Sequence, residues 1–385
     1  MIGPNGSYII IDTNPPKQPQ LNIDNKIERL KLYPHYKQKS TEWLEQRKNY
    51  ICGSEAAALL GLNIYETQYN GIKKKLIPTD VDYSNMVWGN ATEKIIASLY
   101  EYLMNVKINE YGLIPHPTYN NIGASPDGIV GKFTREGNTI SPFYGRLVEI
   151  KSLVKRKISV NPKIKKDIVP SYYIPQVLQQ LESCDLYDCD VFQVKVSEYG
   201  SWKEFIGDSS TRYTLSKDNK FKSIAIQLLP KDTPSDINTN EINKISTFIS
   251  LPNIDTSNID LINWCKTVQA KLSYDYLIYK FIYCKIEYGR CTNIQRNTDI
   301  FNSYIPVYNK MWEYITILRE SNDKRDIFIR IIDYYENLEG KRLKYPDTKK
   351  KLNTTIMNIL DDIVRLINNK ETIYTHYMGV LQKAR

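Results

Sequence analysis

The most informative part of the chain is Ser125-Pro126-Asp127-Gly128, followed after a short interval by Leu147-Val148-Glu149-Ile150-Lys151. Side chains alternate between the two faces of a strand, so Glu149 and Lys151 point to one side and Ile150 points to the other. The apolar neighbours predict a strand that enters a hydrophobic core, where a Glu and a Lys without partners would be costly. The two charged side chains therefore need either a metal ion or each other.

Asp127 and Glu149 are suited to hold Mg²⁺, a hard cation that takes oxygen ligands and keeps several water molecules. The backbone carbonyl of Ile150 offers a third oxygen. Hydrolysis of a phosphodiester also needs an activated water molecule and a positive charge near the transition state, and Lys151 can supply that charge. Asp-Gly turns and Glu-x-Lys strands are each common on solvated surfaces, so only the apolar surroundings favour a metal site over this alternative.

A third carboxylate lies upstream, on a helical pattern that opens at Trp88-Gly89-Asn90-Ala91-Thr92-Glu93 and runs through Met104. Glu93 shares a stripe with apolar residues of this pattern and is therefore expected to face inward. A Glu in the first turn of a helix also suits the helix dipole, which is the structural alternative. The inward placement favours a role near the metal.

A second helical pattern covers residues 172–182, with Pro175 in its first turn. Gln176 and Gln180 are one turn apart on this helix and share a face. A side-chain amide can hold water or phosphate without changing the charge of a site. A plain amphipathic helix explains the same pattern, more readily for Gln180 than for Gln176.

The segment after residue 40 predicts an anion pocket. Arg47 lies on a helix that Ser40 or Thr41 would cap, and Ser54 is expected to cap a following helix that ends at Gly61. Free N–H groups at a helix start bind phosphate, and an Arg guanidinium adds a forked pair of donors. A capping serine and a surface arginine are the structural alternative.

Five motifs, in this order, resemble the lambda-exonuclease or YqaJ-like viral recombinase group of PD-(D/E)xK nucleases. The resemblance spans roughly residues 40–200 and rests on Trp43-x3-Arg47-x6-Ser54-x2-Ala57, Gly89-x3-Glu93, Ser125-Pro126-Asp127-Gly128, Glu149-x-Lys151 and Tyr173-x2-Gln176. It implies an α/β (α+β) fold with a restriction-endonuclease-like core, in which a mixed central sheet is flanked by helices.

The resemblance also implies catalytic roles at the matching positions. The catalytic residues would be Asp127, Glu149, Lys151, Glu93 and Gln176. The metal ligands would be Asp127, Glu149, Glu93 and the Ile150 carbonyl, around a pair of Mg²⁺ ions that Mn²⁺ can replace.

Contacts to the terminal 5′-phosphate of DNA are implied in the same way. Arg47, Ser54 and Ser125 match the positions that make these contacts in processive members. A further basic residue follows the catalytic strand in the family, and here Arg156 and Lys157 are both candidates for it.

The function implied is that of a Mg²⁺-dependent 5′→3′ exodeoxyribonuclease acting on double-stranded DNA ends and releasing 5′-phosphomonoesters, in viral DNA recombination, repair or replication. An endonuclease on the same core is the alternative within the enzyme class. A noncatalytic DNA-binding recombination scaffold is the alternative from another class. Expected partners are double-stranded DNA, a single-strand annealing protein and further copies of the chain, with no membrane.

Composition is compatible with this function. The net charge of +9 and the pI near 8.9 allow nucleic-acid binding, although an AT-rich genome would encode a similar excess of Lys and Asn. The cysteines form no CxxC pair, which argues against a structural zinc site. Without a long apolar run or a signal pattern, the chain is expected to be soluble and intracellular, in the cytoplasm or nucleus of an infected host cell if it is viral.

Three segments are expected along the chain. Residues 1–38, rich in Pro, predict an extended or disordered N-terminal arm, and residues 39–230 predict the exonuclease core. Residues 240–385 predict an α-helical C-terminal extension. Its Lys349-Lys350-Lys351 run could touch the DNA backbone or form a solvated face, and its Tyr274–Tyr283 aromatic cluster could pack in a core or stack on bases.

Overall fold

The computed structural model describes residues 8–16, 21–36, 40–77, 83–137, 139–161, 163–164, 168–272, 274–339, 345–365, 375–377, 379 and 382. Its strands are β1 (Ile9–Asp12), β2 (Ile51–Cys52), β3 (Val106–Asn109), β4 (Ile114–Pro115), β5 (Ile122–Ala124), β6 (Gly128–Thr134), β7 (Leu147–Leu153), β8 (Asp188–Tyr199), β9 (Lys222–Pro230), β10 (Thr247–Ser250) and β11 (Tyr276–Gln295). Its helices are α1 (Ile23–Lys31), α2 (Thr41–Lys48), α3 (Gly53–Leu59), α4 (Gln68–Leu76), α5 (Ser84–Met104), η1 (Ser171–Tyr173), α6 (Ile174–Cys184), α7 (Trp202–Gly207), α8 (Thr239–Ile245), α9 (Asn258–Leu272), α10 (Thr298–Glu320), α11 (Asn322–Glu339) and α12 (Pro346–Arg365).

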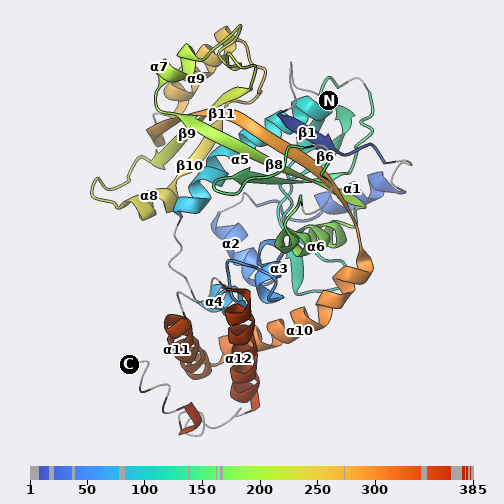
Figure 1. Ribbon diagram of the computed structural model, residues 1–385, viewed down its shortest axis with the longest axis vertical. Coiled ribbons are helices and arrows are strands. Elements are labelled where there is room, and N and C mark those ends of the chain that lie inside the picture. The colour runs from blue at the N-terminus through green and yellow to red at the C-terminus, as the bar shows by residue number, and fades with distance from the viewer. Residues whose placement is uncertain are drawn as a thin grey trace.

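A large mixed sheet forms the centre of the molecule, with strand order β10-β9-β11-β8-β7-β6-β3 and with β1 added beside β11 (Figure 1). Neighbouring strands are antiparallel, except that β7 is parallel to β8 and β1 is parallel to β11. A smaller sheet has the order β2-β5-β4. The expected α/β (α+β) fold, a mixed central sheet flanked by helices, is confirmed.

Helices cover both faces of the large sheet. Successive strand residues point to opposite faces, so each face presents apolar side chains to a helix. Ile129 and Leu147 point into one hydrophobic cluster, which includes buried residues of α1 and α6. Val130 and Val148, their neighbours in sequence, point into another cluster on the opposite face, which is built around α5. The strand after Leu147 therefore presents Glu149 to the α6 side.

The N-terminal segment contains the strand β1, which is extended as expected, and the helix α1, which corrects the expectation of an extended or disordered arm for residues 23–31. β1 pairs in parallel with β11, and α1 buries Ile27 and Leu30. Lys26 Nζ donates to the Asp185 carbonyl at 2.8 Å, and Arg29 donates to the Ser183 carbonyl at 3.1 Å. Both carbonyls lie at the C-terminal end of α6, where cations are stabilised by the helix dipole.

The region 240–385 is not entirely α-helical, which corrects the expectation for its first part. β10 and β11 belong to the large sheet, where β11 lies between β8 and β9. The helix α9 lies between these two strands in the chain, and the succession of helices α10, α11 and α12 starts at Thr298. β11 gains its stability from antiparallel pairing with β8, a partner far back in the chain that local sequence patterns do not reveal. Within the aromatic cluster on β11, Phe281 and Tyr283 pack against buried residues, whereas Tyr279 is exposed.

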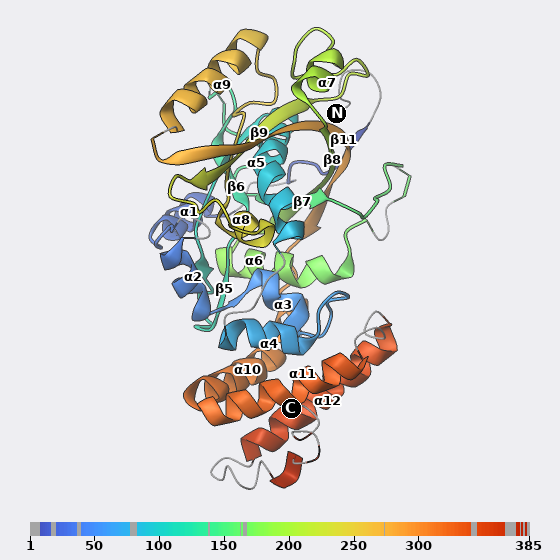
Figure 2. The ribbon, with the colours of Figure 1, turned by 90° about the vertical axis from the view of Figure 1, so that its left-hand side faces the viewer.

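The C-terminal helices α10 and α12 pack against α3 and α4. Phe301, Tyr308 and Ile356 share one hydrophobic cluster with Leu59 of α3 and Tyr69 of α4. Figure 2 shows α10, α11 and α12 below α4, at the end of the molecule opposite α7 and α9. The expected segment boundary near residue 230 falls between β9 and α8, and the division into independent domains stays a prediction.

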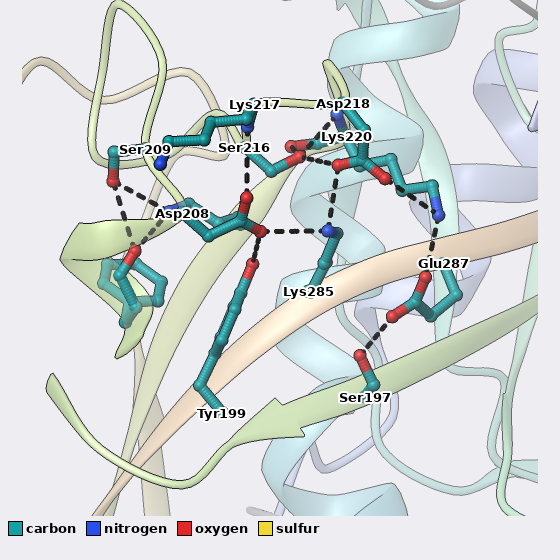
Figure 3. A network of polar contacts seen from close by, with 12 residues as sticks. Ser197, Tyr199, Asp208, Ser209, Ser216, Lys217, Asp218, Lys220, Lys285 and Glu287 are labelled. Carbon is teal, nitrogen blue, oxygen red and sulfur yellow. Dashed lines mark hydrogen bonds and ion pairs between the residues drawn. The ribbon is translucent and has the colours of Figure 1, made fainter. Parts of the chain in front are cut away.

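A network of ion pairs and hydrogen bonds fastens the loop after α7 to strands β8 and β11 (Figure 3). Lys285 Nζ lies 2.9 Å from Asp208 Oδ2 and 2.9 Å from Asp218 Oδ1, and the Tyr199 hydroxyl donates to Asp208 at 2.5 Å. Burial alone would raise the pKa of Asp208, but the bonds from Tyr199 and Lys285 outweigh it and lower that pKa. Both aspartates therefore remain charged partners of Lys285 at neutral pH.

Candidate active site

Glu149 is the centre of a hydrogen-bonded cluster between β7 and α6. Its side chain is 1% exposed, and its Oε1 accepts from Lys151 Nζ at 2.5 Å and from Gln176 Nε2 at 2.7 Å. Its Oε2 accepts from Gln180 Nε2 at 2.7 Å. The prediction that Glu149 and Lys151 point to one side is confirmed, and each supplies the partner that the buried charge of the other needs.

Lys151 is held by more than the Glu149 carboxylate. Its Nζ donates to Gln176 Oε1 at 3.2 Å and lies 4.8 Å from the ring centroid of Tyr173. Burial alone would lower the pKa of Lys151, but the charges of Glu149 and Asp127 outweigh it and raise the pKa above its usual value. The ammonium group is therefore charged at neutral pH and has a fixed direction.

Asp127 lies immediately before β6, at the edge that forms where the paired parts of β6 and β7 separate. These strands pair only through Gly128 with Val148 and through Ile129 with Leu147. One step further on, the Ile150 N–H donates to Asp127 Oδ2 at 2.7 Å. Burial, together with the charges of Glu149 and Glu93, raises the pKa of Asp127 well above its usual value.

Glu93 reaches the same edge from α5. It lines a pocket of about 370 Å³ together with Asp127 and Ile150. The helix begins at Ser84, earlier than its sequence pattern suggests, so Glu93 is not in the first turn and the helix dipole does not explain it. Glu93 and Glu149 thus approach Asp127 from different sides of the strand edge.

The oxygen atoms at this edge, from carboxylates and a backbone carbonyl, are of the chemical type that Mg²⁺ binds. The N–H and C=O of one strand residue project toward the same neighbouring strand, so the Ile150 carbonyl points to the edge where Asp127 lies. Within the described residues, no three His, Cys, Asp or Glu side chains lie together as a ready metal site. Mg²⁺ does not need such a cage, because it binds through one or two carboxylates and keeps several waters.

Because Gly128 has no side chain, β3 can pack closely against the start of β6. A Cβ atom at this position would lie 1.9 Å from Cγ2 of Ile108 on β3, well inside van der Waals contact. A side chain here would therefore push β3 away or displace the turn that carries Asp127.

α6 joins the carboxylate cluster to the smaller sheet. Gln179 Nε2 donates at 2.8 Å to both the Ile51 carbonyl of β2 and the Gly123 carbonyl of β5. A Cβ at Gly53, the first residue of α3, would lie 3.5 Å from Gln176 Cγ. The start of α3 is thereby held beside the residue that bonds Glu149.

Arg47 lies at this start of α3, as the sequence predicts. Its guanidinium donates to Ser54 Oγ at 3.0 Å and lies 4.4 Å from the ring centroid of Trp43. Ser54 does not cap α3, which corrects the expectation: the cap residue is Cys52, whose N–H donates to Glu55 Oε2 at 3.0 Å. Ser54 is instead exposed, with its hydroxyl facing Arg47.

The helix boundaries around Arg47 otherwise follow the sequence. Of the two candidate caps for α2, Ser40 has the role: its Oγ accepts from the Trp43 N–H at 3.2 Å. Gly61 follows the end of α3 with a φ of +72°, a conformation that glycine adopts without strain.

Glu55 is a residue that sequence reasoning missed. Its carboxylate lies 3.4 Å from the Arg47 guanidinium and 2.8 Å from Lys75 Nζ. The spacing Cys52-x2-Glu55 was a usable signal, since an acidic residue three places after a cap commonly bonds the cap N–H. Part of the charge of Arg47 is therefore neutralised inside the protein.

The remaining phosphate-site candidates differ in their surroundings. Ser125 lies next to α6, with its carbonyl 3.4 Å from Gln180 Nε2, and its buried hydroxyl has no hydrogen-bond partner among the described residues. Arg156 bonds to Gln193 Oε1, and its guanidinium lies 5.7 Å from the Tyr173 ring centroid. Lys157 is exposed. Arg156 is linked to Lys151 through their shared contact with the Tyr173 ring.

Gln180 is a residue whose hydrogen-bond partner the structure identifies. The sequence places it on the same face as Gln176 but leaves a plain amphipathic role open. Its bond to Glu149 makes it part of the cluster. The i, i+4 spacing of the two glutamines was the signal.

Two further observations concern the cysteines and the helices. All six cysteines are free, and only Cys265 is not fully buried. In the part of the chain that the structure describes, no helix has the length and apolar character needed to cross a bilayer.

Comparison with curated proteins shows relatives in two viruses. An uncharacterized protein of Acanthamoeba polyphaga mimivirus is 30% identical over 320 residues, which are 80% of this chain and 58% of the mimivirus protein. A protein of African swine fever virus is 28% identical over 162 residues, which are 36% of this chain and 44% of the viral protein. The chain thus spans about half the length of these relatives.

Among solved structures, an alkaline exonuclease from Laribacter hongkongensis aligns with 73% of this chain and 95% of its own, at 15% identity and a TM-score of 0.37. The model of the YqaJ-like viral recombinase domain matches residues 42–186, the segment that holds Arg47, Glu93, Asp127 and the Glu149 cluster. Residues 42–186 are thus similar to the YqaJ-like viral recombinase domain, the resemblance that the motifs in this segment predict.

Proposed function

We propose that this protein is a metal-dependent deoxyribonuclease, acting as a 5′→3′ exonuclease on the ends of double-stranded DNA. The observation that carries the proposal is the meeting of Asp127, Glu149 and Lys151 where β6 and β7 separate. A buried carboxylate, a second carboxylate of raised pKa and a fixed ammonium group are what phosphodiester hydrolysis requires. The match to the recombinase family supports the same reaction class.

Asp127 and Glu149, together with the Ile150 carbonyl, would hold the metal, and Glu93 would assist directly or through a water molecule; Mg²⁺ is the best candidate and Mn²⁺ a substitute. The metal would act as a Lewis acid on a phosphoryl oxygen and lower the pKa of a bound water molecule. Gln176 and Gln180 hold the Glu149 carboxylate in place. The raised pKa of Lys151 favours a role as a charged donor to the developing negative charge rather than as the base.

The contacts at the start of α3 support recognition of a DNA end. Gly53 lies against Gln176, which places Ser54 and Arg47 next to the catalytic cluster. A guanidinium has five N–H donors, so Arg47 can bond Ser54, Glu55 and a phosphate together. A terminal 5′-phosphate bound there would present the end of a strand, rather than an internal bond, to Glu149 and Lys151.

The test uses the full chain with linear duplex DNA labelled at either end, with and without a 5′-phosphate, beside a covalently closed circle, all with Mg²⁺. The proposal expects shortening from phosphorylated 5′ ends, release of 5′-mononucleotides and an intact circle. Cutting of the circle would indicate an endonuclease on the same core. Absence of cutting with Mg²⁺ and with Mn²⁺ would reject the enzyme and leave a DNA-binding scaffold.

Two variants connect the activity to the site. Glu149→Gln keeps the size of the side chain and removes the charge, so cleavage should be lost while DNA binding remains. Glu28→Gln, on the exposed face of α1, is the matched control and should retain wild-type activity. Arg47→Gln should slow digestion of 5′-phosphorylated ends more than that of unphosphorylated ends; equal slowing of both would remove Arg47 from end recognition.

In a viral setting, removal of the 5′ strand would leave a 3′ overhang. A single-strand annealing protein would be the partner that uses this product. Recombination or repair of viral DNA is the process that we infer for the activity, on the basis of the family match.

A further inference from the structure

Three tyrosine rings form a row that leads outward from Lys151. Tyr173 lies under the Lys151 ammonium group, with 4.8 Å between Nζ and the ring centroid. The Tyr172 and Tyr173 rings are edge to face at a centroid distance of 4.6 Å, and the Tyr65 and Tyr172 rings are edge to face at 5.5 Å. Residues far apart in sequence thus connect the catalytic lysine to the loop between α3 and α4.

The outer end of this row is open to solvent. Tyr65 is 71% exposed, and its loop neighbours Leu62 and Ile64 are 48% and 54% exposed. Exposed apolar residues gathered in one loop indicate an interaction site more strongly than single exposed residues do. This loop is also joined to the catalytic cluster through Tyr172.

The loop is fixed in place by α12. Lys349 Nζ donates to the Ile64 carbonyl, and the Gln68 N–H donates to Asn353 Oδ1 at 3.1 Å. Lys349 is buried, so its charge faces the loop rather than solvent, in contrast to the DNA contact or solvated face considered from the sequence. The rings are therefore presented by a rigid support and lose little conformational entropy when they bind a partner.

We propose that Tyr65 and Tyr172 stack on nucleobases of the DNA strand whose phosphodiester bond lies at Lys151, an inference that rests on the proposed nuclease function. Every base has an aromatic face, so a row of tyrosines can hold successive bases without reading their sequence. Tyr173 and Lys151 would place the phosphate at one end of the row, and Tyr65 would hold a base at the other. The C-terminal helix α12 then acts as the support of a nucleotide-binding loop.

The probe is a single-stranded oligonucleotide that carries the fluorescent base 2-aminopurine near its 5′ end, titrated with the full protein in EDTA so that no cleavage occurs. Stacking on tyrosine should quench the fluorescence. Tyr65→Ala should weaken binding by about 5- to 150-fold, the range that corresponds to losing one stacked base. Tyr65→Phe keeps the aromatic face and should restore both affinity and quenching.

Tyr187→Ala is the matched control, because Tyr187 is an exposed tyrosine in the bend before β8, outside the row. It should bind like the wild type. Asn353→Ala, which removes a support of the loop, should weaken binding less than Tyr65→Ala does.

Unchanged binding and quenching in Tyr65→Ala, or equal loss in Tyr65→Ala and Tyr187→Ala, would overturn the stacking role, and a protein partner would then be the better occupant of the loop. Both results can be obtained with an enzyme that still degrades DNA ends, so they leave the nuclease proposal standing. Conversely, stacking in EDTA from a protein that never cleaves would reject the nuclease proposal and retain a DNA-binding loop.

Discussion

The Nε2 amide of Gln180 donates a hydrogen bond of 2.7 Å to Oε2 of Glu149, a residue 31 positions earlier in the chain. Gln176, one helical turn before Gln180, bonds the other oxygen of the same carboxylate. A helix and a strand thereby hold one buried acidic group by both of its oxygens. Groups that hold a catalytic carboxylate in this way commonly affect metal affinity and rate strongly.

Gln180→Ala should therefore reduce DNA cleavage by about 10- to 100-fold, because Glu149 loses a donor and gains freedom to turn. The measurement is the single-turnover rate as a function of Mg²⁺ concentration. Gln227→Ala is the control. Gln227 lies on β9, outside the Glu149 cluster, and is also buried, and its Nε2 donates to Ser246 Oγ at 2.7 Å. Wild-type rates at all Mg²⁺ concentrations would show that Gln176 and Lys151 suffice to hold Glu149.

Gly128→Ala should destabilise the protein by about 1–3 kcal/mol, because the new methyl group overlaps with Ile108 Cγ2. The measurement is urea unfolding. Adding Ile108→Ala removes the overlapping atom, so the double variant should lose less than the sum of the two single variants. Gly207→Ala, where a Cβ meets nothing within 4 Å, is the control. Strict additivity of the two losses would mean that β3 moves away freely.

Arg146→Met should destabilise the protein by about 3–5 kcal/mol, since it leaves buried charges without a partner. Arg146 is 2% exposed and lies 2.5 Å from Asp188 Oδ2 and 3.3 Å from Asp190 Oδ2. The check is the midpoint of urea unfolding, compared with Lys48→Met, which breaks an exposed ion pair with Glu45 and should cost well under 1 kcal/mol. Equal losses in the two variants would contradict the argument.

His116 should make the protein less stable in mild acid. Burial lowers the pKa of His116 from 6.5 to about 4, and its Nδ1 accepts from the Thr118 and Tyr119 N–H groups. Between these two pKa values the unfolded chain binds a proton that the folded protein does not, so the free energy of unfolding falls as the pH decreases from 6.5 toward 4. The loss through His116 by pH 4.5 is about 2–3 kcal/mol.

His116→Asn tests this linkage, because its side-chain oxygen can accept the same N–H groups and does not titrate. The free energy of unfolding of the wild type and of the variant, measured at pH 7 and at pH 4.5, gives the result. The decrease between the two pH values should be smaller in the variant by about 2–3 kcal/mol. An identical decrease in both proteins would show that His116 is protonated without loss of structure.

Local patterns sufficed for the core of the site. Period-two alternation put Glu149 and Lys151 on one face of β7, and helical periodicity put Gln176 and Gln180 on one face of α6. These relations depend only on backbone geometry within a few residues, which is why they could be read from the sequence. The strand β1 and the helix α1 could not be predicted in this way. β1 is stable only against β11, and α1 only against the end of α6, and both partners are distant in sequence.

Local sequence patterns therefore account for the chemical groups at the candidate site: Asp127 on a turn, Glu149 and Lys151 on a strand, and two glutamines on a helix. Only the tertiary structure decided that β11 pairs between β8 and β9, that Glu55 shares Arg47 and that α12 supports the loop of Tyr65. The physical reason is that alternation and helical turns are local properties of the backbone. Pairing and burial between segments distant in sequence depend on the collapse of the whole chain around its cores.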